Sequence, residues 1–422
     1  MLILYEICLI VYTLCYLPVL ILKGKWHGGF VQRLGFFPRA LALKASAQEN
    51  VWLHAVSVGE VTAIAELLKR IKSHFPSYQI VLTVSTKTGY ELAQKKFSQS
   101  AVILWAPLDF WCSVAHFVRV IKPKVYIVAE TELWPNLFSR LNRAHIPIVL
   151  VNGRISDLSV NKYLKIRWFM KRFLGCVNSF CMQSQLDADR ILAMGAPKER
   201  VKNSGNVKFD DLPQDNPKTQ EQFGFLPNDQ IWIAGSTHPG EEEIVLEVYK
   251  RVQKHFPLLR LVIVPRHIER VSEVERVVQT NGLFSVMYSE IKNQKLEPNK
   301  IVIVDAIGHL RVLYSLATIV FVGKSLTVQG GHNIIEPAFF SKPIIVGPHM
   351  QNFRDVMQAF KNKQAVIEVH DTDELARAME DMLANPAKRD ELGKKARNVI
   401  RQEEGATKRI MDEISIYMKA RP

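Results

Sequence analysis

Short apolar runs alternate with longer amphipathic stretches along most of the chain. In the first half the apolar runs predict strands at 51–56, 79–84, 101–105, 124–129, 146–151 and 177–182. In the second half they predict strands at 231–234, 261–264, 301–304, 319–322, 343–346 and 365–369. Between the strands lie helical patterns such as 61–72. Near-continuous apolar strands that alternate with helices indicate an α/β fold, with parallel sheets covered on both faces.

The alternation pauses at residues 209–229, which are rich in Asp, Pro and Gln, and this segment is predicted to be a linker. It divides a domain at 23–208 from a second domain at 230–422, in which the helical tail is expected to close the second half. Both domains are predicted to be doubly wound and Rossmann-like. They are expected to face one another across a central cleft, with ligands bound at the carboxyl ends of the strands.

Residues 1–22 are apolar throughout apart from Glu6, and about 20 such residues can just cross a hydrocarbon core. No basic residue precedes the run, and no small-residue cleavage site follows it. We therefore expect an uncut N-terminal membrane anchor. The basic flank that begins at Lys23 and Lys25 predicts that both domains lie on the cytoplasmic side. The alternative is a buried first helix of a soluble protein.

The chain carries 55 Lys and Arg against 41 Asp and Glu, a net charge of +14, which suits nucleic acid, an anionic membrane or phosphorylated ligands. Residues 161–173 interleave basic and aromatic side chains on one predicted helix, which fits a membrane surface or nucleic acid. The predicted anchor favours the membrane, so no nucleic-acid partner is expected. The five scattered cysteines form neither a disulfide framework nor a zinc motif, and they favour a reducing compartment.

Several common motifs are absent from the sequence. No G-x-G-x-x-G follows a strand, and no P-loop, H-E-x-x-H or C-x-x-C occurs, which disfavours nicotinamide enzymes, P-loop NTPases and common zinc hydrolases. Asp187 and Asp189 form a D-x-D, which in some nucleotide-sugar enzymes binds a metal and the nucleotide. Because they follow Ser184 at a predicted helix start, we interpret them as first-turn charges and expect no metal.

Three glutamates follow predicted strands of the first half. Glu60 comes after a tight turn at the start of a helix, where the dipole stabilises its anion, so it is a candidate general base. Simple matching of a carboxylate to the helix dipole is the alternative. Glu130 and Glu132 end the strand at 124–129 and could bind hydroxyls or amines of an acceptor, unless they lie in a solvated loop.

Four strand ends of the second half carry residues suited to a nucleotide. Helix starts and glycine-rich turns offer N–H groups to phosphate, arginine binds it bidentately, and a carboxylate can accept ribose hydroxyls. These residues are Ser236, Thr237 and His238; Arg266 and His267; Asp305, Gly308 and His309; and Gly330, Gly331, His332, Asn333 and Glu336. Each strand end has a capping or packing alternative, but together they predict a nucleotide site.

The segments HAVSVGE, AETELWPNL, NGRISDLS, GSTHPGEEE, PRH and GGHNIIEPA, in this order behind the apolar N-terminus, closely resemble the Kdo transferases. This family adds 3-deoxy-D-manno-oct-2-ulosonic acid (Kdo) to the lipid A precursor, lipid IVA, in lipopolysaccharide inner-core biosynthesis. The resemblance covers nearly the whole chain. It implies a GT-B fold, CMP-Kdo as donor, inversion at the anomeric carbon, no metal or other cofactor, and the cytoplasmic leaflet of the bacterial inner membrane as the location.

The resemblance also implies roles for individual residues. Glu60 matches the family's proposed base, which would deprotonate a hydroxyl of the lipid A glucosamine or of a first Kdo. The positions that match the CMP site are Pro265, Arg266, Ile307, Gly308, His309, Leu310, Asn333, Ile334, Ile335 and Glu336. The family often has glutamate where this chain has His309, and a turn that holds CMP by its backbone would tolerate that change.

Two other functions are compatible with the same pattern. One is a UDP-sugar enzyme of the same architecture, either a lipid-linked glycosyltransferase or a 2-epimerase. The other is a non-catalytic membrane-surface binding module built on a degenerate transferase. Stabilisation by CMP compared with UDP would discriminate among them, since neither alternative predicts a preference for cytidine.

Overall fold

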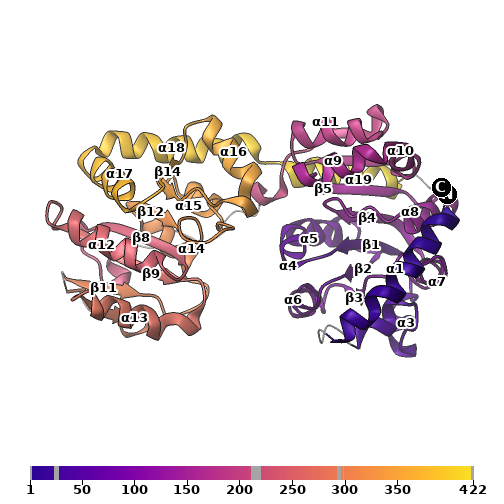
Figure 1. The fold of residues 1–422 in the computed structure, drawn as a ribbon, viewed down its shortest axis with the longest axis horizontal. Helices are drawn as coiled ribbons and strands as arrows, with labels where there is room; N and C mark the ends of the chain where they lie inside the picture. Colours follow the sequence, from indigo (N-terminus) through magenta and orange to yellow (C-terminus); the bar gives the residue numbers. More distant parts are fainter. Residues whose placement is uncertain (1, 23–27, 211–219, 292–295, 298, 420–422) are drawn as a thin grey trace. The chain divides into compact units, whose positions relative to one another are not determined.

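The computed structural model describes residues 2–22, 28–210, 220–291, 296–297 and 299–419, and the chain forms two compact units. Unit 1 comprises Met1–Asp211 and Glu404–Pro422, and unit 2 comprises Leu212–Glu403. Each unit is built on one seven-stranded sheet with helices packed on its faces (Figure 1). Part of the predicted linker (211–219) and the basic flank at 23–27 lie outside the described residues.

The sheet of unit 1 is parallel, with strand order β3-β2-β1-β4-β5-β6-β7. Its strands are β1 (Asn50–Ala55), β2 (Gln79–Val84), β3 (Val102–Trp105), β4 (Pro123–Ala129), β5 (Ile148–Gly153), β6 (Ser179–Met182) and β7 (Val201–Asn203). The winding direction reverses between β1 and β4. Ligands of open α/β sheets bind at such a switch point, beside the carboxyl ends of the strands.

Helices cover both faces of this sheet. They are α1 (Leu2–Leu22), α2 (Gly29–Arg33), α3 (Arg39–Ala45), α4 (Val58–Ala63), α5 (Ala65–His74), α6 (Lys87–Phe97), α7 (Trp111–Ile121), α8 (Pro135–Arg143), α9 (Asp157–Lys165), α10 (Arg167–Leu174), α11 (Gln185–Met194) and α19 (Ala406–Lys419). Alternate residues of β1 enter separate cores: Trp52 packs with Phe117 of α7, while Leu53 packs with Leu67 of α5. This two-sided burial explains why the strands are apolar at nearly every position.

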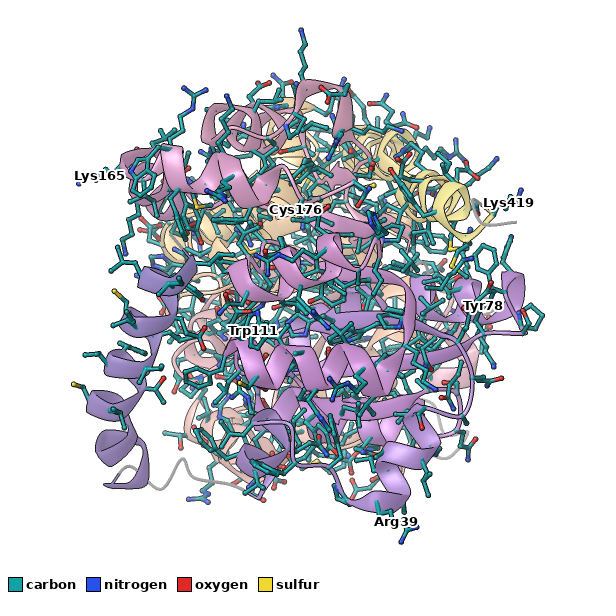
Figure 2. The ribbon with its side chains drawn as sticks, turned by 90° about the vertical axis from the view of Figure 1, so that its right-hand side faces the viewer. Arg39, Tyr78, Trp111, Lys165, Cys176 and Lys419 are labelled. Atoms are coloured by element: carbon teal, nitrogen blue, oxygen red, sulfur yellow. The ribbon has the colours of Figure 1, made fainter. Side chains whose placement is uncertain are left out.

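The N-terminal helix α1 is joined to unit 1 by polar contacts. Tyr5 donates to Asp109 at 2.9 Å, and Glu6 accepts the Trp111 N–H at 3.1 Å and an N–H of Asn136. Figure 2 shows α1 along the margin of the molecule. Within the part of the chain that the structure describes, no helix combines the length and apolar character needed to cross a bilayer. The predicted membrane-spanning anchor, and the inner-membrane localisation that depended on it, are therefore wrong.

The basic and aromatic stretch at 161–173 forms two helices, where one was predicted. Helix α9 ends at Lys165 and α10 begins at Arg167, with Ile166 non-helical between them. Met170 and Phe173 are buried in the core, whereas Trp168 is 68% exposed. Half of this apolar face therefore serves packing within unit 1. The preference for a membrane over nucleic acid rested on the anchor and loses that support.

The sheet of unit 2 is also parallel, with strand order β10-β11-β9-β8-β12-β13-β14. Its strands are β8 (Gln230–Thr237), β9 (Leu259–Pro265), β10 (Phe284–Met287), β11 (Lys300–Ile303), β12 (Ile319–Val322), β13 (Ile344–Val346) and β14 (Ile367–Glu368). Its helices are α12 (Glu241–Gln253), α13 (Val271–Thr280), α14 (Leu310–Leu316), α15 (Ile335–Phe339), α16 (Arg354–Asn362), α17 (Thr372–Ala384) and α18 (Pro386–Glu403). The switch point lies between β8 and β12.

The last helix, α19, belongs to unit 1, although the sequence predicts that the tail closes the second half. Its apolar face, which includes Ile410 and Ile414, packs in the same core as α5. At its start, the Gly405 and Thr407 N–H groups donate to Asp210. Helical periodicity shows that a face is apolar but does not identify the sheet that it covers, so the sequence could not assign this helix.

Candidate active site

Glu60 is the third residue of α4, the helix that follows the carboxyl end of β1. Its carboxylate accepts the Val56 N–H at 2.7 Å and the Ser57 hydroxyl at 3.2 Å, and the residue is 7% exposed. Ser57 occupies the N-cap position without a side-chain capping bond, so the Glu60 side chain reaches back to the turn instead. These contacts hold the carboxylate in one place at the switch point of unit 1.

Burial raises the pKa of Glu60 to about 7; the nearby charges of Glu130 and Glu132 also raise it, while the Val56 N–H and the Ser57 hydroxyl lower it. The sequence predicts a stabilised anion at a helix start. The removal of water from the carboxylate outweighs that effect here. A carboxylate that titrates near neutral pH is well suited to accept a proton in catalysis.

Glu130 and Glu132 follow β4, the strand that pairs with β1. Burial, and then the charge of Glu130, raises the pKa of Glu132 to about 7. Glu130 has a positive φ of 54°, which is uncommon for a residue with a side chain, and its N–H donates to the Val151 carbonyl at 2.9 Å. The structure thus brings all three predicted carboxylates to one edge of the sheet, which we call the acidic edge.

The D-x-D segment serves the structure of α11. Asp187 is buried, accepts the Ile155 N–H at 2.7 Å and the Ser184 hydroxyl at 2.6 Å, and donates its own N–H to Ser184. These contacts agree with a helix-start role. Over the described residues, no group of three or more His, Cys, Asp or Glu side chains is arranged to hold a metal ion.

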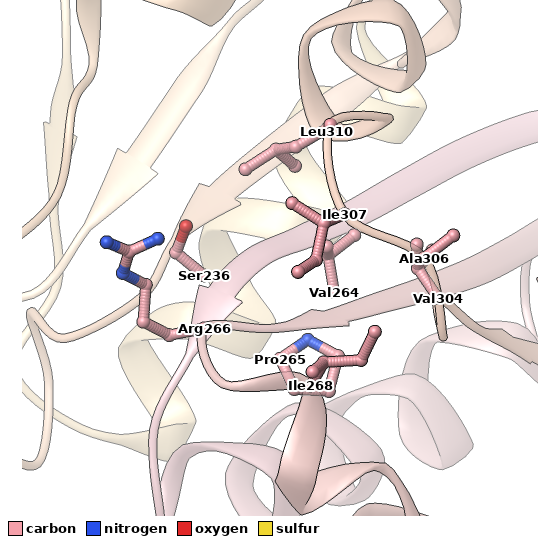
Figure 3. Close-up of a pocket in the computed structure, with 10 residues that line it drawn as sticks. Ser236, Val264, Pro265, Arg266, Ile268, Val304, Ala306, Ile307 and Leu310 are labelled. Atoms are coloured by element: carbon pink, nitrogen blue, oxygen red, sulfur yellow. The ribbon is translucent and has the colours of Figure 1, made fainter. Parts of the chain in front are cut away.

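In unit 2 a small pocket of about 100 Å³ lies beside the ends of β8, β9 and β11. Its lining residues are Ser236, Val264, Pro265, Arg266, Ile268, Val304, Ala306, Ile307, Gly308 and Leu310. Figure 3 shows the Arg266 guanidinium beside Ser236, with Ile307 and Leu310 on the other side. Ile307 is 83% exposed, so its apolar side chain is available to pack against a flat ring. Six predicted residues therefore line one pocket.

The other predicted residues of unit 2 occupy different environments. Thr237, Ile334 and Ile335 are buried within the fold. The Asn333 side chain accepts the Ile335 N–H at 3.0 Å and donates to Glu336 at 3.3 Å. Glu336 also forms an ion pair with Arg311 at 3.1 Å. This ion pair links the start of α14 to the start of α15. Sequence reasoning missed Arg311 because nothing distinguished it from other helical arginines.

His309 and Asp305 are bound to the segment that follows β10. The His309 Nδ1 lies 3.1 Å from the Tyr288 hydroxyl, and His309 does not line the pocket. The Asp305 carboxylate accepts the Ser289 N–H at 3.0 Å and the Ser289 hydroxyl at 2.5 Å. Both side chains therefore help to shape the turn, whose residues Ile307 and Gly308 line the pocket.

Sequence models of two families match the chain. The family described as 3-deoxy-D-manno-octulosonic-acid transferase (kdotransferase) matches residues 29–211, and glycosyl transferases group 1 matches residues 242–399. A 3-deoxy-D-manno-octulosonic acid transferase of Haemophilus influenzae is 33% identical over 413 residues, which cover 96% of this chain and 95% of that protein. These matches extend over both units.

A bifunctional glycosyltransferase/methyltransferase of Fusobacterium nucleatum is 37% identical over 340 residues, or 79% of this chain. The match covers 52% of that relative, so the chain spans about half of its length. Among solved structures, a putative UDP-N-acetylglucosamine 2-epimerase from Listeria monocytogenes has a TM-score of 0.59 at 12% identity, with 89% of this chain and 98% of that chain covered. That likeness shows the fold alone, a GT-B-like pair of α/β units.

The family assignment rests on the full-length similarity. The relative of 33% identity is matched over 96% of this chain and 95% of its own length. The kdotransferase model matches most of unit 1, and the general glycosyltransferase model matches most of unit 2. The chain is a glycosyltransferase and belongs to the 3-deoxy-D-manno-octulosonic acid transferase family.

Proposed function

We propose that this protein transfers Kdo from CMP-Kdo to a hydroxyl of the lipid A precursor, lipid IVA, with inversion at the anomeric carbon and without a metal. The observation that carries the proposal is the position of Glu60, a buried carboxylate held by two hydrogen bonds at a sheet switch point and titrating near neutral pH. Membership of the family supports the sugar, and the resemblance of the motifs supports the donor and the acceptor.

In the proposed reaction Glu60 accepts the proton of the acceptor hydroxyl as that oxygen bonds to the anomeric carbon. The bond from this carbon to the phosphate oxygen breaks, and CMP leaves with the electron pair. Attack from the face opposite the leaving group gives inversion. With a pKa of about 7, a large fraction of Glu60 is in the base form at neutral pH while it remains basic enough to take a proton.

Glu130 and Glu132 are proposed to hold the acceptor next to Glu60. Carboxylates accept hydrogen bonds from hydroxyl groups, and both residues share the acidic edge with Glu60, as their effect on its pKa indicates. Because the acidic edge carries like charges, it favours a neutral or cationic part of the acceptor and disfavours a phosphate. The acceptor group at Glu60 is therefore proposed to be a sugar hydroxyl.

The CMP moiety is proposed to bind in unit 2, with the phosphate at the exposed guanidinium of Arg266 and the base beside Pro265 and Ile307. Gly308 has a φ of 92°, which turns the backbone so that the segment from Ile307 to Leu310 can border the nucleotide. Glu336 and Asn333 are proposed to approach the ribose, with Arg311 fixing the Glu336 carboxylate.

The test is transfer by Glu60→Gln, with CMP-Kdo generated in the assay, detergent-dispersed lipid IVA as acceptor, and mass analysis of the product. We expect a loss of roughly 10²- to 10⁴-fold in rate with unchanged affinity for CMP, since general-base catalysis contributes about that much. A variant that retains near-normal turnover would remove Glu60 from the base role. Stabilisation of the unaltered protein by UDP but not by CMP would favour a UDP-sugar enzyme instead.

A further inference from the structure

Three histidine rings meet at the carboxyl edge of the unit 2 sheet, outside the pocket described above. His238 follows β8, His267 follows β9, and His332 lies in the loop after β12. The Nε2 atoms of His238 and His332 are 3.2 Å apart, and their rings stack at a 24° angle with centroids 5.4 Å apart. The His267 ring meets His238 edge-on at 5.8 Å. Since β8 and β12 flank the switch point, this cluster occupies the position where such sheets bind ligands.

The backbone around these rings is strained and firmly held. Ser236, next to the last residue of β8, and Lys324, after β12, both have a φ of 57°, a conformation that costs on the order of 1–3 kcal/mol for a residue with a side chain. The fully buried Glu241 carboxylate accepts the N–H groups of His238, Lys324, Ser325 and Leu326 at 2.7–3.0 Å. One carboxylate therefore fastens the two loops to each other, and with them the two rings.

The groups around the stacked pair are cationic. Burial, and then the charges of Lys324, Arg266 and the neighbouring histidines, lowers the pKa of His238 to about 4 and of His332 to about 3. Arg270 also acts on His238, but its guanidinium is bound to Glu242 and Glu273. Within the described part of the chain, neither the Arg266 nor the Lys324 side chain is seen in an ion pair, and the Glu241 carboxylate is occupied by backbone N–H groups.

The arrangement has a direction. Arg266 lines the pocket together with its chain neighbour Pro265 and with Ile307, and its charge also acts on both stacked rings. Along this edge of the sheet the pocket comes first, Arg266 follows, and the two stacked rings with Lys324 come last. A CMP-linked 2-ulosonic acid has the same order, because the phosphate oxygen and the carboxylate are attached to the same anomeric carbon. If the ligand phosphate binds at Arg266, the carboxylate on the same anomeric carbon lies next to the phosphate, on the side of the stacked rings and Lys324.

We propose that His238, His332 and Lys324 form the subsite for the carboxylate of the donor sugar acid. Each neutral imidazole has one N–H, and the contact between the two Nε2 atoms uses one of them, so the stacked pair offers one N–H donor to a ligand. The Lys324 ammonium supplies the charge that a carboxylate requires. The inference rests on the proposed function, in which CMP-Kdo is the donor. It adds the residues by which the enzyme would select an acidic sugar over a neutral sugar. A donor without the carboxylate leaves Lys324 and the rings without a partner, so specificity for a sugar acid follows from this edge.

The experiment compares affinities of the full chain for cytidine, CMP and CMP-Kdo by calorimetry, without acceptor. The variants are Lys324→Met and the double change His238→Gln with His332→Gln. Each should weaken CMP-Kdo binding by about 10- to 100-fold and change CMP binding by less than about threefold. Lys254→Met and His255→Gln, at exposed positions where α12 ends, are the matched controls and should change neither affinity.

Retained CMP affinity also demonstrates that each variant is folded. Equal losses for CMP and CMP-Kdo would assign the cluster to the phosphate, and unchanged affinities would reduce it to packing; either result overturns the inference. Failure of the proposed function looks different, because the unaltered protein would then bind neither CMP nor CMP-Kdo. If the unaltered protein binds and transfers Kdo while the variants keep full affinity for CMP-Kdo, only the carboxylate subsite is lost.

Discussion

The two units use the same sheet architecture to build edges of opposite charge. In unit 1 the switch point between β1 and β4 gathers the carboxylates of Glu60, Glu130 and Glu132, and burial with like charge raises the pKa of Glu60 and Glu132. In unit 2 the switch point between β8 and β12 gathers imidazoles and cations, and burial together with these charges lowers the pKa of His238 and His332. Parallel strands fix where a site lies, and the residues that follow them decide what it binds.

The contrast divides the proposed reaction between the units. An edge that already repels negative charge can take a proton from a neutral hydroxyl but cannot hold a nucleotide. The edge of unit 2 that carries Arg266, Lys324, His238 and His332, which we call the cationic edge, suits phosphate and carboxylate groups. Its carboxylates Glu241 and Glu242 are bound within the fold. Each unit therefore supplies what the other lacks.

The largest expected effect on the cationic edge is that of Arg266→Ala on donor binding. Loss of a charge-assisted bond to phosphate should weaken CMP affinity by about 10- to 100-fold, while the turnover rate at saturating donor falls much less. Calorimetry with CMP and a saturation series in the transfer assay measure the two effects. Arg276→Ala on α13 serves as the control. An unchanged affinity for CMP would separate Arg266 from the phosphate.

The acidic edge can be tested through Glu130→Gln. Its charge is the largest carboxylate contribution to the raised pKa of Glu60 and also raises that of Glu132, so neutralising it should lower both. If Glu60 must be deprotonated to act, the rate rises with pH through about 7. The midpoint of this rise in the variant should move down by a few tenths of a unit to about one unit. An unmoved midpoint would show that another group controls the pH profile.

A stability measurement on the same edge should show a smaller effect. The folded-state pKa of Glu60 is about 7, above its ordinary 4.5, so folding favours the protonated form and stability declines as pH rises from about 4.5 through 7. Glu60→Gln, which is neutral at every pH, should unfold a few degrees higher than the unaltered protein at pH 8.5. The two should coincide near pH 5. Differential scanning calorimetry with Glu91→Gln, exposed on α6, as control tests this difference.

The sequence predicts the central strands of both sheets well and the edge strands poorly. The twelve predicted strands all have a counterpart, because buried parallel strands read as continuous apolar runs. Strands β7 and β10 were missed: β7 (Val-Lys-Asn) and β10 lie at sheet edges, are partly exposed and lack such a run. The two compact units divide after Asp211, and α19 returns to unit 1. That return depends on tertiary packing, which periodicity does not record.

The sequence indicates that the candidate residues lie at strand ends, but it does not indicate which partners their side chains contact. Residues at strand ends were identified because strand–turn–helix patterns reveal where the chain leaves a parallel sheet. What the sequence could not reveal is partner choice: Glu336 with Arg311, Glu241 with four backbone N–H groups, and the stacking of His238 on His332. The N-terminal anchor failed for a related reason, since hydropathy does not detect that Tyr5 and Glu6 have polar partners in the fold.

The smallest expected effect concerns His309, where the resembled family often has glutamate. Its ring bonds to Tyr288 and does not line the pocket, so the nucleotide should meet only the backbone of this turn. We expect His309→Glu to change CMP affinity by less than about threefold, and Tyr288→Phe to do the same. Calorimetry measures the CMP affinity of both variants, and the loss measured for Arg266→Ala is the reference for a large effect. A loss for His309→Glu as large as that for Arg266→Ala would show that the side chain at this turn takes part in CMP binding.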